Sequence, residues 1–437
     1  MTLIDLTAPA VRSSRLDGLP VAIIGAGPIG LAAAANLVER GIDFVIYESG
    51  ESAGSSIDQW GHILFFSPWR HLIDPAARRL LEANGWRAPG DVTAPTGADF
   101  LSRYLRPLAQ LDEIASRTRS GITVSAVSRV GMDRTRTANR AQTPFLLRIT
   151  DASGAIDEVS ARAVIDASGT YLTPNSLAST GLEPLGLPEV ADRVSHALPD
   201  VLGRERSQFA GRHTTVVGAG HSAANTVLNL ARLAQEEPGT RITWLIRNAS
   251  AVRVSSSPDD ELAARAAIGS RVDQLVADGT VEQLDRFEIV RLTRSGSGVR
   301  LIGHRNGELV EHQTDIVVNA TGFRPNLDML REIRLELDEI VEAPKRLAPL
   351  IDPNIHSCGT VAPHGFAELE QPEPNFFLAG MKSYGRAPTF LLATGYEQVR
   401  SITAWLAGDV ASATNVQLVL PATGVCSTDQ APGSCCS

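Results

Sequence analysis

Two segments of the chain repeat the same order of strand, glycine-rich turn, helix and strand, and this repeat constrains the fold more than any other feature. The first runs from residue 20 to 48, with the apolar stretch VAII directly before the turn GAGPIG at 25–30. The second runs from 213 to 247, with the turn GAGHSA at 218–223. Each order is typical of a βαβ unit that binds a dinucleotide. The sequence therefore predicts an α/β fold with two Rossmann-like dinucleotide-binding domains.

The first turn has the residues that a nucleotide with a free ribose needs. Gly25 allows the tight turn, Gly27 lets a pyrophosphate approach the backbone at the helix N-terminus, and Gly30 permits close packing of helix and strand. Glu48 follows at the end of the second strand, where a carboxylate can accept hydrogen bonds from ribose hydroxyls.

The second turn differs at two positions. Ala223 replaces the third glycine, and the second strand ends in Arg247 instead of an acid. A carboxylate would repel the 2′-phosphate of NADPH, whereas a guanidinium can bind it with two hydrogen bonds. The sequence therefore favours NADPH over NADH at this site, and a surface arginine without a cofactor role is the alternative.

Together the two units indicate a flavoprotein, with FAD in the first and NADPH delivering hydride from the second. Two further strands, in ARAVIDASG (161–169) and DIVVNATGF (315–323), each open into a turn of small residues and glycine. Such turns are expected where a chain crosses between two nucleotide domains.

With these motifs the chain resembles the flavin-containing monooxygenases from about residue 18 to 409. That family pairs an FAD turn GxGxxG with an NADPH turn GxGxSA and has ATG-type turns at the domain crossings. Several stretches are similar to one subgroup, the flavoprotein monooxygenases of bacterial arsenic-resistance operons. They are WGHILFFSPWRHLIDPAARRLLE, VVGAGHSAANT, LIDPNIHSCGTVAPHG, GMKSYGRAPTFLLATGYEQVRS and the Cys-Cys tail.

The resemblance implies two sets of binding residues. The FAD set is Gly25, Gly27, Pro28, Gly30, Glu48, Trp60, Gly380, Pro388 and Thr389. The NADPH set is Gly218, Gly220, His221, Ser222, Ala223 and Arg247. A final helix that begins near Pro388 or Thr389 would direct its N-terminal amides at the flavin's pyrimidine edge, which is negatively charged in the reduced flavin. Gly380 stands where related flavoproteins often have aspartate, so the resemblance implies a contact through its backbone.

The chain also departs from the family pattern. Where the family usually has an asparagine near the flavin, the segment FFSPWRHLID places Ser67, Trp69 and Arg70, and of the family's FxGxxxH stretch only Ser195 and His196 remain. Reduction of the flavin by NADPH is therefore better supported than oxygenation. Ser67 and Arg70 stay candidates for catalysis, and Trp60 and Trp69 are candidates for the pocket or for the core.

Three of the four cysteines, Cys426, Cys435 and Cys436, lie in the last twelve positions. Three thiolates suit a soft ion such as trivalent arsenic, and a closed zinc site normally needs four ligands. The same cysteines are catalytic candidates as electron acceptors from the flavin, and an inert tail is the alternative. In IHSCGTVAPHG, a buried Cys358 with hydrogen-bonded histidines is a more common arrangement than a second soft-metal site.

The composition is that of a globular protein of two or three domains, with 437 residues of which 43% are hydrophobic and 20% charged. A net charge of −9 disfavours nucleic acid and anionic membranes as partners, and no apolar stretch reaches the ~18 residues of a membrane helix. We expect a cytoplasmic protein whose cysteines are free thiols, metal or metalloid ligands, or redox groups rather than structural disulfides. The expected divisions are a leader (1–17), the first part of the FAD domain (18–189), an inserted NADPH domain (190–312), the second part of the FAD domain (313–409) and a flexible cysteine-containing tail (410–437).

Local signals predict several elements. Asp74 and Pro75 are the N-cap and first residue of a helix, and turns at 151–154 and at Asn306-Gly307 each join two strands of a hairpin. Ser257 and Pro258 begin a further helix, and VQLVL (416–420) reads as a short strand.

The leading hypothesis is an NADPH-dependent FAD monooxygenase that acts with molecular oxygen on a small soft substrate, an arsenic or sulfur compound. A reductase that acts through the C-terminal cysteine pair on a thiol-bound metalloid or a disulfide is the second hypothesis. A redox or metalloid sensor without catalysis is the third. A homodimer remains open.

Overall fold

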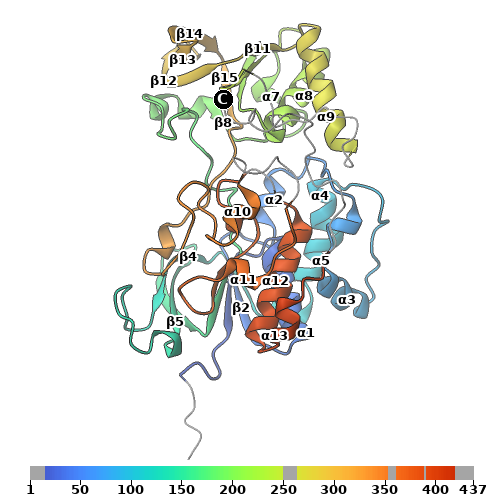
Figure 1. Cartoon of the computed structure of the whole chain (residues 1–437). Helices are drawn as coiled ribbons and strands as arrows, with labels where there is room; N and C mark the ends of the chain where they lie inside the picture. Colours follow the sequence, from blue (N-terminus) through green and yellow to red (C-terminus); the bar gives the residue numbers. More distant parts are fainter. Residues whose placement is uncertain (1–14, 250–262, 353–360, 388–389, 419–437) are drawn as a thin grey trace, which may run out of the picture.

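The computed structural model describes residues 15–249, 263–352, 361–387 and 390–418. It has two lobes, each centred on a five-stranded parallel sheet (Figure 1). In each sheet the strand that precedes a glycine-rich turn lies in the middle, with its βαβ partner beside it. The predicted α/β fold with two Rossmann-like units is confirmed.

The first lobe contains the sheet β16-β7-β1-β2-β3 and an antiparallel sheet β4-β5-β6. The parallel strands, in that order, are Phe376–Leu378, Ala163–Asp166, Val21–Ile24, Phe44–Glu48 and Thr118–Ser120. The antiparallel strands are Thr123–Arg129, Phe145–Thr150 and Ile156–Ala161. The antiparallel sheet covers one face of the parallel sheet, because Val127, Phe145 and Leu147 share a buried cluster with Ala22 and Ile24.

Helices cover the other face of this sheet. Helix α1 (Pro28–Glu39) is alanine-rich, and Ala32 to Ala35 are all fully buried, so α1 packs closely against both the sheet and α12 (Leu392–Leu406). The other α-helices of this lobe are α2 (Ser55–Gln59), α3 (Pro75–Ala83), α4 (Gly97–Phe100), α5 (Arg106–Ala109), α6 (Asp112–Ala115), α10 (Ala348–Ile351), α11 (Phe366–Leu369) and α13 (Val410–Thr414). A π-helical turn, η2 (Leu101–Leu105), joins α4 to α5.

The second lobe contains the sheet β11-β10-β9-β15-β8 and the antiparallel sheet β12-β13-β14. The parallel strands are Glu282–Leu284, Arg241–Leu245, His213–Val217, Ile316–Asn319 and Val194–Ser195, and the antiparallel ones are Phe287–Ser295, Gly298–Arg305 and Glu308–Thr314. The helices are α7 (Arg206–Phe209), α8 (His221–Glu236) and α9 (Ala263–Ala277).

Five 3-10 turns, distributed over both lobes, complete the described secondary structure: η1 (Trp69–His71), η3 (Arg140–Gln142), η4 (Leu187–Arg193), η5 (Asp328–Leu330) and η6 (Gly380–Tyr384).

The chain enters and leaves the second lobe through two adjacent segments. Asn175 donates its backbone N–H to the Gly322 carbonyl, and Arg324 donates to Thr173. The rings of Tyr171 and Phe323 lie 5.2 Å apart. The second lobe is thus an insertion in the first, and both connections lie side by side.

The return to the first lobe comes later than the expected boundary at 312–313. Strand β15 (Ile316–Asn319) pairs with β8 and β9 in the second sheet, and the next strand of the first sheet is β16. Local patterning did not show this, because a buried parallel strand gives the same apolar signal in either sheet.

Several local predictions are confirmed. Asp74 accepts a hydrogen bond from the Ala77 N–H as the N-cap of α3, and β5-β6 and β13-β14 form the two predicted hairpins. The left-handed φ of Asn306 and Gly307, 53° and 84°, fits the tight turn between β13 and β14.

Predictions near the C-terminus need correction. Helix α12 begins at Leu392, three residues after Thr389, and Pro388 and Thr389 themselves lie outside the described residues. The segment from residue 410 begins with helix α13, whose Ala413 is buried and accepts a hydrogen bond from Ser401. Residues 416–418 are not in a strand. The tail therefore departs from the folded body later than residue 410. The described part of the chain contains no helix long and apolar enough to cross a membrane.

Candidate functional site

The first glycine turn joins β1 to α1. Two of its glycines, Gly25 and Gly30, are closely packed by backbone atoms, and the third, Gly27, faces open space. Gly25 has a φ of 97°, and a Cβ there would lie 2.9 Å from the Ala167 carbonyl oxygen. A Cβ on Gly30 would lie 1.9 Å from the Gly25 carbonyl oxygen. A Cβ on Gly27 would meet no protein atom within 4 Å. The backbone at the start of α1 is therefore free to receive a pyrophosphate, as the sequence predicts.

The second turn, between β9 and α8, repeats this geometry. Gly218 has a φ of 135°, and a Cβ there would lie 2.1 Å from the Ala320 carbonyl oxygen. Gly220, the N-cap of α8, again faces open space. Ala223 is fully buried and takes the place of the third glycine, so helix and strand leave room for a methyl group here. Both turns fit a dinucleotide for the same reason, because a Cβ at Gly27 or at Gly220 would meet no protein atom within 4 Å.

The two sites differ at the ends of their second strands. Glu48 is buried and directed at the first turn, because its carboxylate accepts hydrogen bonds from the Ala26 N–H (2.7 Å), the Gly50 N–H (2.8 Å) and the Ser55 hydroxyl (3.0 Å). Arg247 lies after β10 and its side chain is exposed. An acid beside one turn and an exposed cation after the matching strand of the other give the two sites opposite charge.

The lobes meet close to the second turn. The ring of Phe66, from the first lobe, lies 4.9 Å from the ring of His221, the first residue of α8. Arg204 of the second lobe donates a hydrogen bond to the Gln59 carbonyl at 3.4 Å. His62 lies in the same segment of the first lobe, and burial lowers its pKa although the charges of Asp200 and Glu205 act in the opposite sense.

Gly380 begins η6 after β16 and packs against α1. Its φ is 68°, and a Cβ would lie 2.9 Å from Ile29. The resemblance implies that the backbone of Gly380 contacts the flavin. In the structure its N–H donates a hydrogen bond to the side-chain carbonyl oxygen of Gln398 at 2.8 Å. The Gln398 amide in turn lies 2.9 Å from His364 Nε2. Burial lowers the pKa of His364. In this structure the Gly380 N–H therefore already has an acceptor within the protein, the Gln398 side chain.

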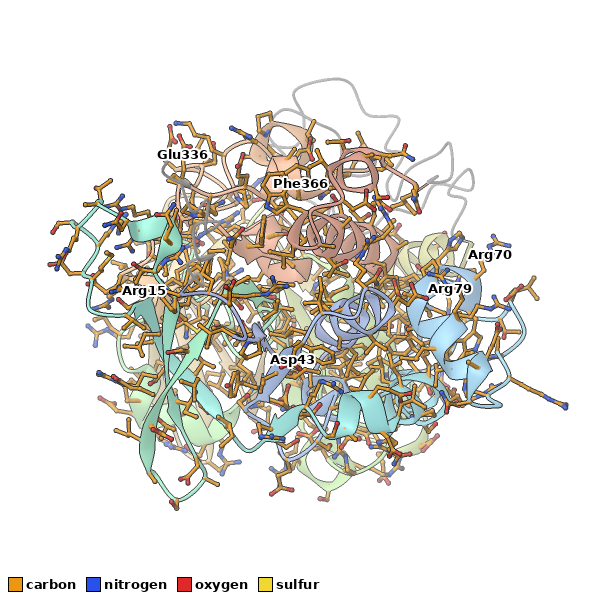
Figure 2. All side chains as sticks on the ribbon, turned by 90° about the horizontal axis from the view of Figure 1, so that it is seen from below. Arg15, Asp43, Arg70, Arg79, Glu336 and Phe366 are labelled. Atoms are coloured by element: carbon orange, nitrogen blue, oxygen red, sulfur yellow. The ribbon has the colours of Figure 1, made fainter. Side chains whose placement is uncertain are left out.

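The remaining candidates divide between core and surface. Trp69 is buried against Phe100, with ring centroids 6.0 Å apart, so it belongs to the core. Trp60 is partly buried, 5.5 Å from Phe65. Arg70 is exposed, contacts the His71 ring and projects at the periphery of the molecule (Figure 2). Ser67 is half-buried. The structure does not bring Arg70 and Trp69 together in one polar site.

All four cysteines, including Cys426, Cys435 and Cys436, lie outside the described residues, as do His356 and Ser257. Within the described ranges no group of three or more His, Cys, Asp and Glu side chains could hold a metal ion. The arsenic-binding and dithiol hypotheses therefore remain predictions.

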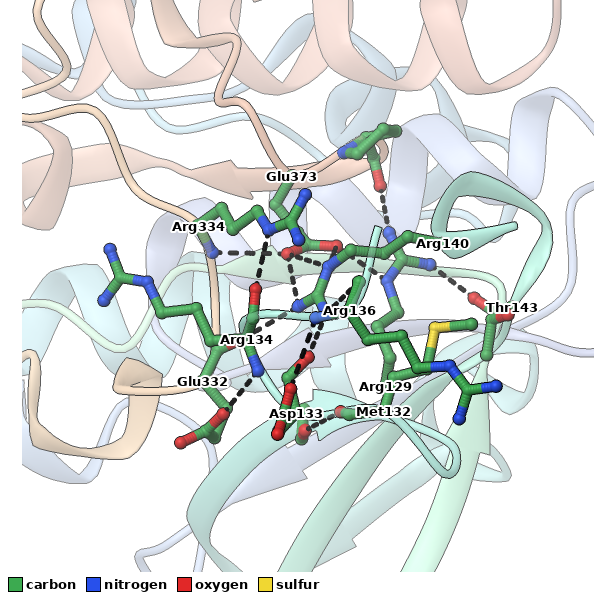
Figure 3. Close-up of polar contacts among 12 residues, drawn as sticks. Arg129, Met132, Asp133, Arg134, Arg136, Arg140, Thr143, Glu332, Arg334 and Glu373 are labelled. Atoms are coloured by element: carbon green, nitrogen blue, oxygen red, sulfur yellow. Dashed lines mark hydrogen bonds and ion pairs between the residues drawn. The ribbon is translucent and has the colours of Figure 1, made fainter. Parts of the chain in front are cut away.

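The sequence motifs did not predict two clusters of buried ion pairs. Lys382 Nζ donates to Asp166 Oδ2 at 2.6 Å, with both side chains almost completely buried. In the other, Glu373 bridges Arg129, the last residue of β4, and Arg140, in the segment between β4 and β5 (Figure 3). Charged residues in a sequence are normally assigned to the surface, and only the scarcity of lysine gives a signal for the first cluster.

Family models match two parts of the chain. Residues 147–357 match the family described as pyridine nucleotide-disulphide oxidoreductase, and residues 23–82 match an NAD(P)-binding Rossmann-like domain. The chain is an NAD(P)H-dependent flavoprotein oxidoreductase. Its predicted cofactors, FAD and NADPH, are confirmed. No curated protein matches this oxidoreductase in sequence.

Solved structures resemble this flavoprotein oxidoreductase over most of its length. A bacillithiol disulfide reductase from Bacillus cereus is 21% identical, with a TM-score of 0.66 over 89% of this chain and 99% of that one. An FAD-bound cadaverine monooxygenase of desferrioxamine biosynthesis from Erwinia amylovora is 14% identical, with a TM-score of 0.61 over 94% and 99%. An ornithine hydroxylase from Pseudomonas aeruginosa is 15% identical, with a TM-score of 0.60 over 90% and 99%. At these identities the likeness shows the fold.

Proposed function

We propose that this protein is an NADPH-dependent, FAD-containing monooxygenase in which FAD binds at the Gly25 turn and NADPH at the Gly218 turn. One observation carries the assignment of the two sites. Strand β2 ends in the buried carboxylate of Glu48, whereas the exposed guanidinium of Arg247 lies two residues beyond the end of the matching strand β10. A carboxylate suits a ribose with free hydroxyls, and a guanidinium suits a 2′-phosphate.

Each element of the chain has a defined task in this proposal. The N-termini of α1 and α8 supply backbone N–H groups to the two pyrophosphates beside Gly27 and Gly220. Glu48 is already held towards the first turn by the Ala26 N–H, so little ordering is needed when a ribose binds. Bound FAD would supply the hydride acceptor and the reaction with oxygen.

The proposed substrate is a small, soft arsenic or sulfur compound. The support is the resemblance of five stretches to the arsenic-operon flavoprotein monooxygenases and the three cysteines near the C-terminus. Soft thiolate ligands match trivalent arsenic better than hard cations.

A reductase is the second candidate, and a specific observation favours it. The match over residues 147–357 is to a family named for disulphides, and a structurally similar protein reduces bacillithiol disulfide. The chain has no CxxC pair beside either glycine turn, so electrons would have to pass through Cys435 and Cys436.

The deciding experiment follows NADPH oxidation and oxygen uptake together in the purified yellow protein. It is run with and without arsenite, with and without a low-molecular-weight disulfide, and with and without residues 420–437. Oxygen uptake that equals NADPH consumption and requires arsenite, without release of hydrogen peroxide, supports the monooxygenase. Anaerobic, disulfide-dependent oxidation that Cys435→Ser with Cys436→Ser abolishes supports the reductase. A yellow protein that oxidises no NADPH under any condition refutes both.

A further inference from the structure

The chain uses lysine at only two positions, Lys345 and Lys382, among 40 lysine and arginine residues. Lys345 is exposed and lies 3.7 Å from Glu336. The side chain of Lys382, in contrast, is 1% exposed. Arginine supplies almost every other cation, so the buried position is one of two where this protein has an ammonium group. A guanidinium is planar and larger than an ammonium and presents its donors in a fixed fork, so the two groups are not interchangeable at a buried position.

Lys382 joins the turns that follow two neighbouring strands. Its Nζ donates to Asp166 Oδ2, at the end of β7, at 2.6 Å and contacts the Ser168 hydroxyl at 3.0 Å. Asp166 Oδ1 accepts hydrogen bonds from the Ser168 N–H (3.1 Å) and hydroxyl (2.7 Å). Lys382 itself lies in η6, after β16. One ammonium therefore fixes η6 and the 166–169 turn relative to each other.

The same turn contacts the first glycine motif. Ala167 donates its N–H to the Ile24 carbonyl at 3.0 Å. A Cβ on Gly25 would lie 2.9 Å from the Ala167 carbonyl oxygen and 3.0 Å from the Ser168 Cα. Ser168 is exposed at this edge of the sheet, and its hydroxyl donates a hydrogen bond to Asp166 and accepts one from Lys382. Ligands of open parallel sheets bind at this carboxyl edge.

Stability alone does not account for the buried pair. Removing two charges from water is costly, and a pair of apolar side chains of similar size would hold the turns together equally well or better. A buried ion pair does fix geometry, because its directional hydrogen bonds allow one arrangement of the connected turns.

We propose that Lys382 is a positioning residue for FAD, which acts through Asp166 and Ser168 to hold the 166–169 turn against the Gly25 turn. The proposal rests on the proposed FAD site. It assigns a role to a residue that lies outside both glycine turns in the sequence.

The test measures the rate of FAD release from the purified holoenzyme on dilution, followed by flavin fluorescence, with the urea midpoint measured alongside. Lys382→Met should release FAD about tenfold faster or more, the effect of about one lost hydrogen bond, whereas the matched control Lys345→Met should be unchanged. Ser168→Ala keeps the buried pair and should also speed release, with an unchanged urea midpoint.

A double variant, Lys382→Met with Asp166→Asn, separates positioning from stability because no buried charge is left unpaired. We expect its stability to recover and its FAD release to stay fast. Wild-type FAD release in both Ser168→Ala and the double variant would overturn the proposal. If the wild-type protein neither carries nor binds FAD, the proposed FAD site fails, and that failure is seen before any variant is compared.

Discussion

Replacing Glu373 with glutamine should destabilise the first lobe strongly. Glu373 is buried and accepts hydrogen bonds from Arg129 Nε (2.8 Å), from Arg140 Nε (2.9 Å) and Nη2 (2.8 Å), and from the Arg334 N–H (3.2 Å) (Figure 3). Burial by itself would raise the pKa of Glu373, but the hydrogen bonds from Arg140 and Arg129 lower it below its usual value. The carboxylate is therefore ionised at neutral pH and balances two buried guanidinium groups.

The size of the effect follows from what glutamine leaves behind. Its amide keeps one acceptor oxygen and directs N–H donors at groups that are themselves donors. Arg129 and Arg140 are 1% and 3% exposed, so neither guanidinium can replace a lost hydrogen bond with one to water. Removing one partner of such a buried pair costs about 3–5 kcal/mol. The Glu373→Gln variant should lose that amount in free energy of unfolding.

Urea unfolding at pH 7, followed by tryptophan fluorescence, is a suitable assay because four of the five tryptophans, Trp60, Trp69, Trp86 and Trp405, lie in the first lobe. The matched control is Glu158→Gln, which breaks the exposed Arg148–Glu158 pair on the same antiparallel sheet and should cost about 0–1 kcal/mol. If Glu373→Gln were no more destabilising than this control, the network would not hold the lobe together as argued.

Three further predictions follow from the sites and the core. Burial raises the pKa of Asp74 from 3.8 to about 7. The folded state therefore binds the extra proton, so stability falls as pH rises through that range, and Asp74→Asn, which keeps an N-cap, should flatten this slope in urea midpoints measured against pH. Gly30→Ala should abolish FAD retention because its Cβ would lie 1.9 Å from a backbone oxygen, whereas Ala223→Gly should retain NADP⁺ binding in a calorimetric titration. Arg247→Glu should raise the KM for NADPH about tenfold or more and leave that for NADH within about twofold, and equal effects on both cofactors would count against the 2′-phosphate role.

The glycine turns could be predicted because their constraints are local. A turn with φ near 97° or 135° requires glycine wherever it occurs, and the strand and helix on either side are visible as apolar and alanine-rich runs. The hairpin turn at Asn306-Gly307 and the N-cap at Asp74 are predictable for the same reason. Each depends on a few consecutive residues.

Other features depend on contacts between distant parts of the chain. The sequence of strand β15 does not show which sheet it joins, and the expected boundary at 312–313 places it in the first lobe, whereas it pairs with β9 of the second. Helix α13 is short, and its burial comes from Ser401 and Arg400 of α12, which bind the Ala413 and Ser412 carbonyl groups. Helix α12 begins three residues after Thr389, and its N-cap residue, Leu391, makes no side-chain cap hydrogen bond that the sequence could signal.

The class of this protein can be predicted from its amino-acid sequence alone. Two glycine-rich βαβ units were sufficient to predict an α/β flavoprotein, because backbone sterics act within a few residues. The pairing of charges that are far apart in the sequence, in contrast, is visible only in the folded protein. Lys382 meets Asp166 across 216 positions and Arg129 meets Glu373 across 244, and burial makes these pairs into fixed points of the fold. No pattern in either local segment specifies its partner, because the partner is chosen by the packing of the sheets.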